Sequence, residues 1–251
     1  MRAAVPAHVL VVAKAPVPGL AKTRLGADVG MDAAAGLAAA ALLDTLAAAE
    51  AYAPRERRHV ALAGDLADVP ETDAAALRAA LAGWTVRGQR GEGFDERLAA
   101  AHADVPGPVV QIGMDTPQVT PALLEAVAAG LADHDAVLAP ATDGGWWALA
   151  LRDPAAAAAL RGVPMSTADT CAATRRALEA AGLSVGEAPS LVDVDEVEDA
   201  REVAAAAPAT RFARAWRAAH ARPSGRQAAP NHFESTETPR ATEQQRGGGA
   251  A

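Results

Sequence analysis

The sequence predicts an α/β fold, in which a mostly parallel central sheet is covered by helices on both faces. Short apolar runs bounded by turn residues alternate with longer, alanine-rich stretches of helical spacing, and this alternation is typical of such sheets. The chain has 251 residues, which is enough to bury a core without disulfides or metal. Hydrophobic residues make up 51% of it but aromatic residues only 3%, which indicates an aliphatic core under alanine-rich helices.

Apolar runs between turn residues predict the strands. Buried strands are predicted at residues 8–13, 59–64, 84–89, 108–115, 135–140 and 146–151, with a weaker one at 183–188. Helices are predicted at residues 32–50, 73–81, 94–103, 120–131, 153–160, 167–181, 196–206 and 210–220. Parallel sheets bind ligands at the carboxyl ends of their strands, so functional residues are expected directly after each strand.

Composition limits the partners and the compartment. The formal net charge of −8 argues against a broad nucleic-acid surface. Cys171 has no second cysteine to pair with, which fits a reducing compartment. The apolar run 33–49 is interrupted by Asp44 and is predicted to be too weakly hydrophobic to span a bilayer. We expect a soluble, cytoplasmic protein that binds neither nucleic acid nor a membrane. Residues 222–251 are rich in Pro, Gly, Ser, Thr and Gln, and predict a disordered C-terminal tail after a domain at 1–221.

The loop after the first strand carries clustered positive charge. It reads KAPVPGLAKTRL, in which Lys14, Lys22 and Arg24 surround a turn formed by Gly19 and two prolines. Spacing excludes a Walker A loop and a G-x-G-x-x-G fingerprint. A basic loop between strand and helix, on an acidic protein, favours phosphate binding over an ordinary solvated loop.

Acidic residues follow two other strands. Asp115, in GMDTPQVTPALL, comes directly after an apolar run and is predicted to bind a divalent cation such as Mg²⁺, while Thr120 is the better candidate for capping the next helix. Asp195, in LVDVDEVEDA, is a plausible second ligand, and Asp193 shares its segment. The later acids of that segment suit a helix N-terminus.

The sequence TDGGWW between two predicted strands suggests a site for the acceptor. Asp143 is a candidate for holding or deprotonating the acceptor, and Gly144 and Gly145 would permit close approach, although Asp-Gly is also a common hairpin turn. In an extended chain Trp146 and its neighbour Trp147 face opposite sides, so one is expected in the core while the other stacks on a ligand. Gln89 is a candidate for bordering a nucleotide base. In the same loop, an exposed helix pair explains Glu96 and Arg97 as well as a phosphate contact from Arg97 does.

Taken in order, the motifs KAPVPGLAKTRL, QRGEGFDERLAAA, GMDTPQVTPALL, LAPATDGGWWALAL, MSTADT and DVDEVEDA resemble the bacterial DUF2064 family. That family is GT-A-type glycosyltransferase-like and belongs to the nucleotide-diphospho-sugar transferase superfamily. The resemblance implies a Rossmann-like GT-A fold, phosphate contacts from Lys22 and Arg24, and Mg²⁺ or Mn²⁺ held by Asp115 and Asp195. Departures such as Trp146-Trp147, where tyrosines are common, concern the acceptor pocket.

Three functions are compatible with these motifs. The first is a Mg²⁺-dependent transfer of a sugar from a nucleotide-diphospho-sugar to a small acceptor. The second is a nucleotidyltransferase of the guanylyltransferase type, which uses a nucleoside triphosphate and releases pyrophosphate. The third is a nucleotide-binding protein without catalysis, against which the second predicted metal ligand argues.

Overall fold

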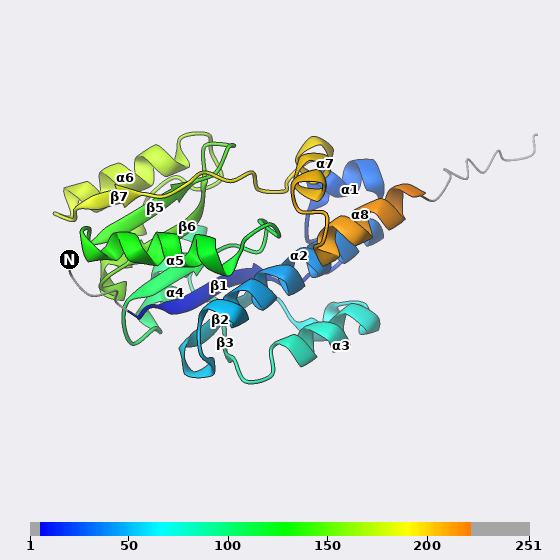
Figure 1. Cartoon of the computed structure of the whole chain (residues 1–251), viewed down its shortest axis with the longest axis horizontal. Helices are drawn as coiled ribbons and strands as arrows, with labels where there is room; N and C mark the ends of the chain where they lie inside the picture. The colour runs from blue at the N-terminus through cyan, green and yellow to red at the C-terminus, as the bar shows by residue number, and fades with distance from the viewer. Residues whose placement is uncertain (1–5, 222–251) are drawn as a thin grey trace, which may run out of the picture. The chain divides into compact units, whose positions relative to one another are not determined.

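A computed structural model describes residues 6–221, and the predicted tail at 222–251 lies outside the described residues. Within this part of the chain the strands form one seven-stranded sheet in the order β3-β2-β1-β4-β6-β5-β7 (Figure 1). The strands are β1 (His8–Lys14), β2 (Arg58–Ala63), β3 (Thr85–Gly88), β4 (Val109–Ile112), β5 (Ala136–Pro140), β6 (Trp146–Leu151) and β7 (Val185–Glu187). β6 runs antiparallel to β4 and β5, and all other pairs are parallel, which confirms the predicted sheet.

Helices cover both faces of the sheet. They are α1 (Thr23–Val29), α2 (Met31–Tyr52), α3 (Glu71–Ala80), α4 (Phe94–Ala103), α5 (Pro121–Ala129), α6 (Thr170–Ala180), α7 (Val197–Ala206) and α8 (Arg211–Ala221). Short 3-10 helices are η1 (Arg55–Arg57), η2 (Leu66–Asp68), η3 (Gly130–Ala132) and η4 (Pro154–Leu160). Buried residues of α2, α3 and α5 share one hydrophobic cluster, and those of α4, η4 and α6 share another, so each cluster belongs to one sheet face.

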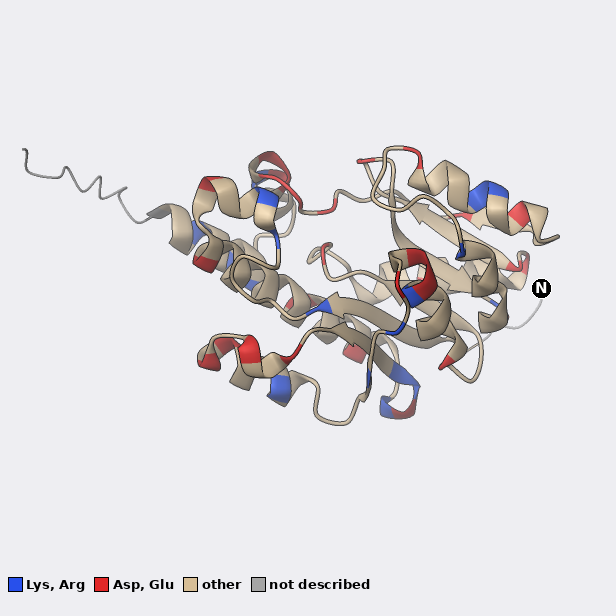
Figure 2. Ribbon diagram, turned by 180° about the vertical axis from the view of Figure 1, so that it is seen from behind, with Lys and Arg blue, Asp and Glu red and all other residues tan. Residues whose placement is uncertain are grey.

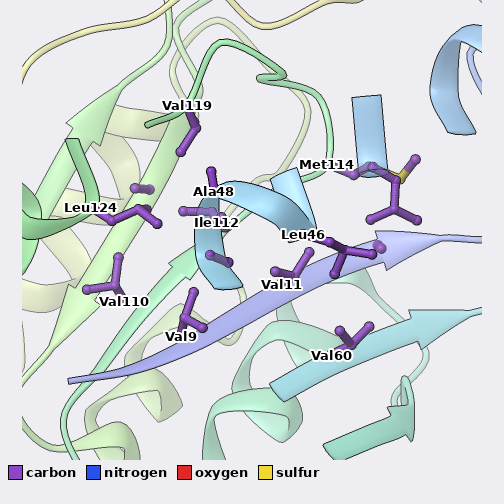
Figure 3. Packing of buried hydrophobic residues seen from close by; sticks show 14 of the residues in the cluster. Val9, Val11, Leu46, Ala48, Val60, Val110, Ile112, Met114, Val119 and Leu124 are labelled. Carbon is purple, nitrogen blue, oxygen red and sulfur yellow. The ribbon is translucent and has the colours of Figure 1, made fainter. Parts of the chain in front are cut away.

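Side-chain alternation along β1 explains how one strand serves both faces. Val9 and Val11 belong to the cluster under α2 and α5, whereas Leu10 and Val12 belong to the cluster under α4 and α6. Figure 3 shows Val9 and Val11 beside Ile112 of β4 and near Leu46 of α2. The apolar residues at every position of this run are therefore buried, as expected for a central parallel strand.

A third cluster of buried residues joins helices away from the sheet. It includes Leu25 of α1, Leu37 of α2, Val203 of α7 and Phe212 of α8. Asp44 of α2, which interrupts the predicted apolar run, accepts hydrogen bonds from the backbone nitrogens of residues 211 (3.0 Å) and 212 (2.8 Å) at the start of α8. This cluster fixes α1 and α7 relative to each other, and the segments that precede both helices carry predicted site residues.

α2 has the length and composition of a membrane-spanning helix, with a mean hydropathy of 1.4 over its most apolar window. The prediction that this run is too weakly hydrophobic does not hold by that measure. In the fold, however, 67% of the window is buried, and the helix packs against the sheet and against α8. The structure therefore uses it as a core helix.

Several local predictions need correction. The strand predicted at 84–89 is β3, an edge strand whose residues are exposed rather than buried. The helix predicted at 153–160 is the 3-10 helix η4. A break at Gly30, whose φ is +92°, separates α1 from α2, so a short helix precedes the predicted one. The helix predicted at 167–181 is α6, which begins three residues later, at Thr170.

Candidate functional site

Two adjoining pockets lie at the carboxyl ends of β1 and β4 and share Met114 and Asp115. The first has a volume of about 200 Å³ and contains Lys14, Lys22, Arg24 and Asp195, so we call it the basic pocket. The second has a volume of about 220 Å³ and contains Asp143 and Trp146, so we call it the acceptor-side pocket. Asp115 therefore stands on the wall between them.

Lys22 is the centre of the basic pocket. Its Nζ lies 2.8 Å from a carboxylate oxygen of Asp115 and 3.9 Å from one of Asp195, and it also donates to the carbonyl oxygen of Val194. The side chain is only 12% exposed. Its backbone adopts the left-handed conformation, with φ +50°, which is uncommon outside glycine and clusters at functional sites. The loop thus directs one ammonium group between two carboxylates.

The other predicted phosphate contacts surround Lys22 or shape its loop. Arg24, 67% exposed, pairs with Asp195, and Lys14 donates from Nζ to the carbonyl oxygen of Leu20 at 2.6 Å. Gly19 does not line the pocket; its φ of +74° forms the turn of the loop. In Figure 2 the acidic segment before α7 passes close to the basic residues at the start of α1. The pocket keeps three cationic side chains around one cavity.

Lysine usage gives a further signal that the motif analysis missed. The lysines of the full sequence are Lys14 and Lys22, and every other Lys or Arg position holds arginine. Both lysines line the basic pocket. A lysine ammonium is a compact point charge, whereas an arginine guanidinium is a wide planar fork, so the two are not interchangeable in a confined space. Both lysines of the sequence thus lie at this pocket, beside Arg24.

The segment before α7 supplies carboxylates to both pockets. Asp195 lines the basic pocket and Asp193 lines the acceptor-side pocket, while Val194 between them is buried. The backbone nitrogen of Val194 donates to the carbonyl oxygen of Asp115 at 2.8 Å, which fixes the segment against the end of β4. Alternation in an extended chain thus divides two nearby acids between two cavities.

The predicted hairpin places Asp143 in the acceptor-side pocket. The carboxylate oxygen Oδ1 of Asp143 accepts from the backbone nitrogen of Gly145 at 2.7 Å, which stabilises the turn between β5 and β6. Gly144 does not line the pocket, whereas Gly145 does. A Cβ at Gly144 would come within 2.0 Å of the Ala168 carbonyl oxygen, so the structure gives this glycine a packing role.

The two tryptophans divide as expected. Trp147 is 3% exposed, and its Nε1 donates to the carbonyl oxygen of Pro189 at 2.9 Å. Trp146 is only partly buried, lines the acceptor-side pocket, and donates from Nε1 to Thr174 Oγ1 at 3.2 Å. Both indoles line the acceptor-side pocket, and Trp146 is the more accessible of the two.

Polar groups that the sequence analysis did not select also line the acceptor-side pocket. Gln111, in the middle of the apolar strand β4, is 2% exposed, and its Oε1 accepts from Nε2 of the fully buried His102 at 3.1 Å. Its amide nitrogen makes no hydrogen bond within residues 6–221. Thr116 is also 2% exposed, and its hydroxyl lacks a partner in the described chain. A glutamine inside an otherwise apolar strand is the signal that could have identified this position.

Burial, with the charge of Asp143 as the next cause, raises the pKa of Asp193 to about 6. The charge of Lys22 opposes this shift, and that of Asp115 adds to it. These couplings show that the acids of the two pockets form one electrostatic system.

Gln89 lies outside both pockets. Its Nε2 donates to the carbonyl oxygens of Ala13 (2.9 Å) and Ala61 (3.0 Å), so the amide joins the ends of β1 and β2. The structure does not bring this residue to the candidate site, and its predicted contact with a base has no geometric support.

Residues 45–167 match the profile of DUF2064, described as an uncharacterized protein conserved in bacteria. The predicted DUF2064 resemblance is confirmed. No curated protein matches the chain.

Solved structures share the fold. A crystal structure from Desulfovibrio desulfuricans G20, provisionally named a nucleotide-diphospho-sugar transferase, has 27% identity and a TM-score of 0.71, covering 86% of this chain and 96% of that one. A cytidylyltransferase from Leptospira borgpetersenii has 11% identity and a TM-score of 0.52, with coverages of 86% and 94%. CMP:2-keto-3-deoxy-manno-octonic acid synthetase, solved with CTP, has 14% identity and a TM-score of 0.50, with coverages of 81% and 99%.

The latter two likenesses show the fold alone. With the match to the Desulfovibrio protein, the comparisons group this chain with transferases, as the sequence predicts. They do not choose between sugar transfer and nucleotidyl transfer.

The side chains at the basic pocket fit a hard divalent cation. Asp115 and Asp195 reach the same nitrogen atom, so their carboxylates are close enough to share one cation. Among the described residues no group of three His, Cys, Asp or Glu side chains could hold a metal. Two protein carboxylates suit Mg²⁺, which typically binds one or two carboxylates and completes its coordination with substrate phosphates and water.

Proposed function

We propose that this DUF2064 protein is a divalent-metal-dependent transferase that moves a sugar from a nucleotide-diphospho-sugar to a small acceptor. The observation that carries the proposal is the position of the Lys22 ammonium between Asp115 and Asp195, in a pocket that also contains Lys14 and Arg24. This set combines cations for a diphosphate with two oxygen ligands for Mg²⁺ or Mn²⁺.

Without ligand, Lys22 neutralises the carboxylates that would hold the metal. When a nucleotide binds, its phosphates offer Lys22 a stronger set of oxygen partners, and Asp115 and Asp195 become available as ligands. A bound divalent cation supplies charge neutralisation for the departing diphosphate. The chain's own contribution is to position the phosphates through Lys14, Lys22 and Arg24 and to hold the acceptor next to them.

Asp143 is our candidate for orienting or deprotonating the acceptor. It lies in the acceptor-side pocket, and one of its oxygens is already fixed by the backbone nitrogen of Gly145. A carboxylate held in this way can accept a hydrogen bond from an acceptor hydroxyl with its other oxygen. Gly145 and Trp146 complete the proposed acceptor contacts.

A nucleotidyltransferase is the second candidate. The three cationic side chains of the basic pocket favour it, because a triphosphate carries more charge than a diphosphate. The guanylyltransferase-like version requires a phosphate-bearing acceptor, and no basic residue of the described chain lines the acceptor-side pocket. That absence favours sugar transfer.

Thermal unfolding with and without ligands tests the proposal. The wild-type protein is mixed with Mg²⁺ or Mn²⁺ and with nucleoside triphosphates, diphosphates or nucleotide-sugars. A ligand that binds only the folded state raises the Tm. We expect a metal-dependent increase with nucleotide-sugars that is lost in Asp115→Asn and kept in the control Asp28→Asn, an exposed position on α1.

Product analysis separates the alternatives. Release of a nucleoside diphosphate from a nucleotide-sugar supports sugar transfer, and pyrophosphate from a triphosphate supports nucleotidyl transfer. Binding without turnover of either donor, across a broad panel of acceptors, favours the non-catalytic function. No change in Tm with any millimolar nucleotide contradicts phosphate binding altogether.

A further inference from the structure

The charges of the two pockets differ in a way that bears on the acceptor. Lys14, Lys22 and Arg24 line the basic pocket, whereas Asp115, Asp143 and Asp193 line the acceptor-side pocket without any Lys, Arg or His from the described chain. Lys22 pairs with Asp115, the residue that the two pockets share. Asp143 and Asp193 have no cationic partner among the ion pairs of residues 6–221. Carboxylates repel an anionic acceptor.

Charge alone does not separate a neutral acceptor from a cationic one, but the hydrogen-bonding groups do. The amide nitrogen of Gln111 can only donate, and the Thr116 hydroxyl can donate or accept. Both side chains are 2% exposed and line this pocket. The Thr116 hydroxyl is buried without a partner in the described chain, and the hydrogen bond of the Gln111 side chain uses its Oε1 and not its amide nitrogen. An ammonium group has no lone pair to offer the Gln111 amide.

A hydroxyl group satisfies both sides of the pocket, because it donates to a carboxylate and accepts from an amide. His102 holds Gln111 in place by donating to its Oε1, which leaves the amide nitrogen as its free donor. Trp146 adds an indole of the kind that packs against an apolar ring face. Leaving a buried donor such as Gln111 unpaired in a complex is unfavourable, so the pocket discriminates against ligands that lack acceptor oxygens.

We infer that the acceptor of this enzyme is an uncharged, hydroxyl-rich small molecule of the sugar or polyol class, bound through Asp143, Asp193, Gln111 and Thr116. The inference rests on the proposed function, because it names the acceptor for the same site. It assigns Gln111 and Thr116 as specificity-determining residues and excludes phosphorylated acceptors.

Binding of matched neutral and charged ligands tests the inference. Tryptophan fluorescence of the full chain is titrated with neutral hexoses, myo-inositol and glycerol, and each is compared with its monophosphate at equal ionic strength. Cyclohexylamine serves as a cation without hydroxyls. We expect at least one neutral compound to bind about tenfold or more tightly than its monophosphate and than the amine.

Two nearly isosteric variants test the hydrogen bonds. Gln111→Met and Thr116→Val are expected to weaken the best neutral ligand about five- to tenfold and to leave the affinity for cyclohexylamine unchanged. Thr45→Val is the matched control, because Thr45 is buried on α2 and does not line this pocket. Circular dichroism and the Tm of each variant verify folding.

Each outcome separates this inference from the proposed function. Tighter binding of the monophosphates or of the amine, no binding of any neutral compound, or equal losses in Thr45→Val overturns the inference, even if nucleotide-sugars still raise the Tm. Selective binding of a neutral compound supports a polyol pocket. If nucleotide-sugars do not raise the Tm of the same preparation, the proposed transferase function is contradicted while the polyol pocket stands.

Discussion

The basic pocket and the acceptor-side pocket share Asp115 but are built differently. The basic pocket takes Lys14 from the end of β1, but Lys22, Arg24 and Asp195 come from the chain around the starts of α1 and α7, helices that pack in the third cluster away from the sheet. The acceptor-side pocket is based on the sheet itself, through Gln111 of β4 and Trp146 of β6. The comparison indicates that the first pocket supplies charge and the second supplies shape and hydrogen bonds.

Asp115 belongs to both pockets, so its loss should have the largest effect. We expect Asp115→Asn to lower kcat/KM about a thousandfold, since it removes a proposed metal ligand and the partner of Lys22. Steady-state kinetics with excess Mg²⁺ measure this, with Asp28→Asn as control. Activity within threefold of wild type would show that the shared wall is not essential.

Lys22→Arg tests whether the basic pocket requires a compact cation. The charge is conserved, but a guanidinium does not fit the confined space between Asp115 and Asp195, so we expect a loss of about a hundredfold in kcat/KM. Arg161→Lys, at an exposed position away from the pockets, is the matched control. Full activity of Lys22→Arg would mean that charge alone is sufficient.

Asp143→Asn should separate the two pockets. We expect kcat or the acceptor KM to change about ten- to fiftyfold, while the Tm increase caused by nucleotide stays as in wild type. The measurement combines acceptor-dependent kinetics with thermal unfolding. If nucleotide binding falls in parallel, Asp143 acts on both pockets and the division is wrong.

His102 gives the smallest expected effect. Burial lowers its pKa to about 4, although its hydrogen bond to Gln111 opposes this shift. The unfolded chain takes up a proton near pH 6.5 that the folded chain takes up only near pH 4, so this contribution to stability is lost as the pH falls through that window. Between pH 6.5 and 5.5 the loss is about 1 kcal/mol.

Urea unfolding of wild type and His102→Gln gives the free energy of unfolding at both pH values. The loss in wild type minus the loss in the variant isolates His102 from His8 and His59, whose pKa values are also lowered. Equal losses in the two proteins would show that folding does not lower the pKa of His102.

Local patterns were sufficient to predict most of the fold. The continuous apolar run of β1, whose successive side chains pack on opposite faces of the sheet, and the Asp-Gly turn before β6 are properties of short segments. The sequence therefore contains them directly. The exposure of β3 depends on its place at the sheet edge, which local hydrophobicity does not encode. The short helix α1 was missed because its seven residues are too few for a periodic hydrophobic pattern.

The candidate site was less predictable because its contacts join distant segments. Asp115 and Asp195 were predicted as two ligands of one metal, but their contact with Lys22, which the structure places near both, was not predicted. Gln111 was overlooked because its strand is otherwise apolar, and its importance depends on His102, which comes from another element. Gly144 was selected for its lack of a side chain, but the neighbour that requires this is the backbone of Ala168.

The contact between Asp44 and the start of α8 limits how far the chain can be shortened. The carboxylate is buried and satisfies the first backbone nitrogens of that helix, and α8 in turn covers the cluster that fixes α1 and α7. A minimal fragment that ended before Arg211 would leave Asp44 unpaired and uncover this cluster. A fragment designed for crystallisation or for fusion to another domain should therefore keep every residue through Ala221.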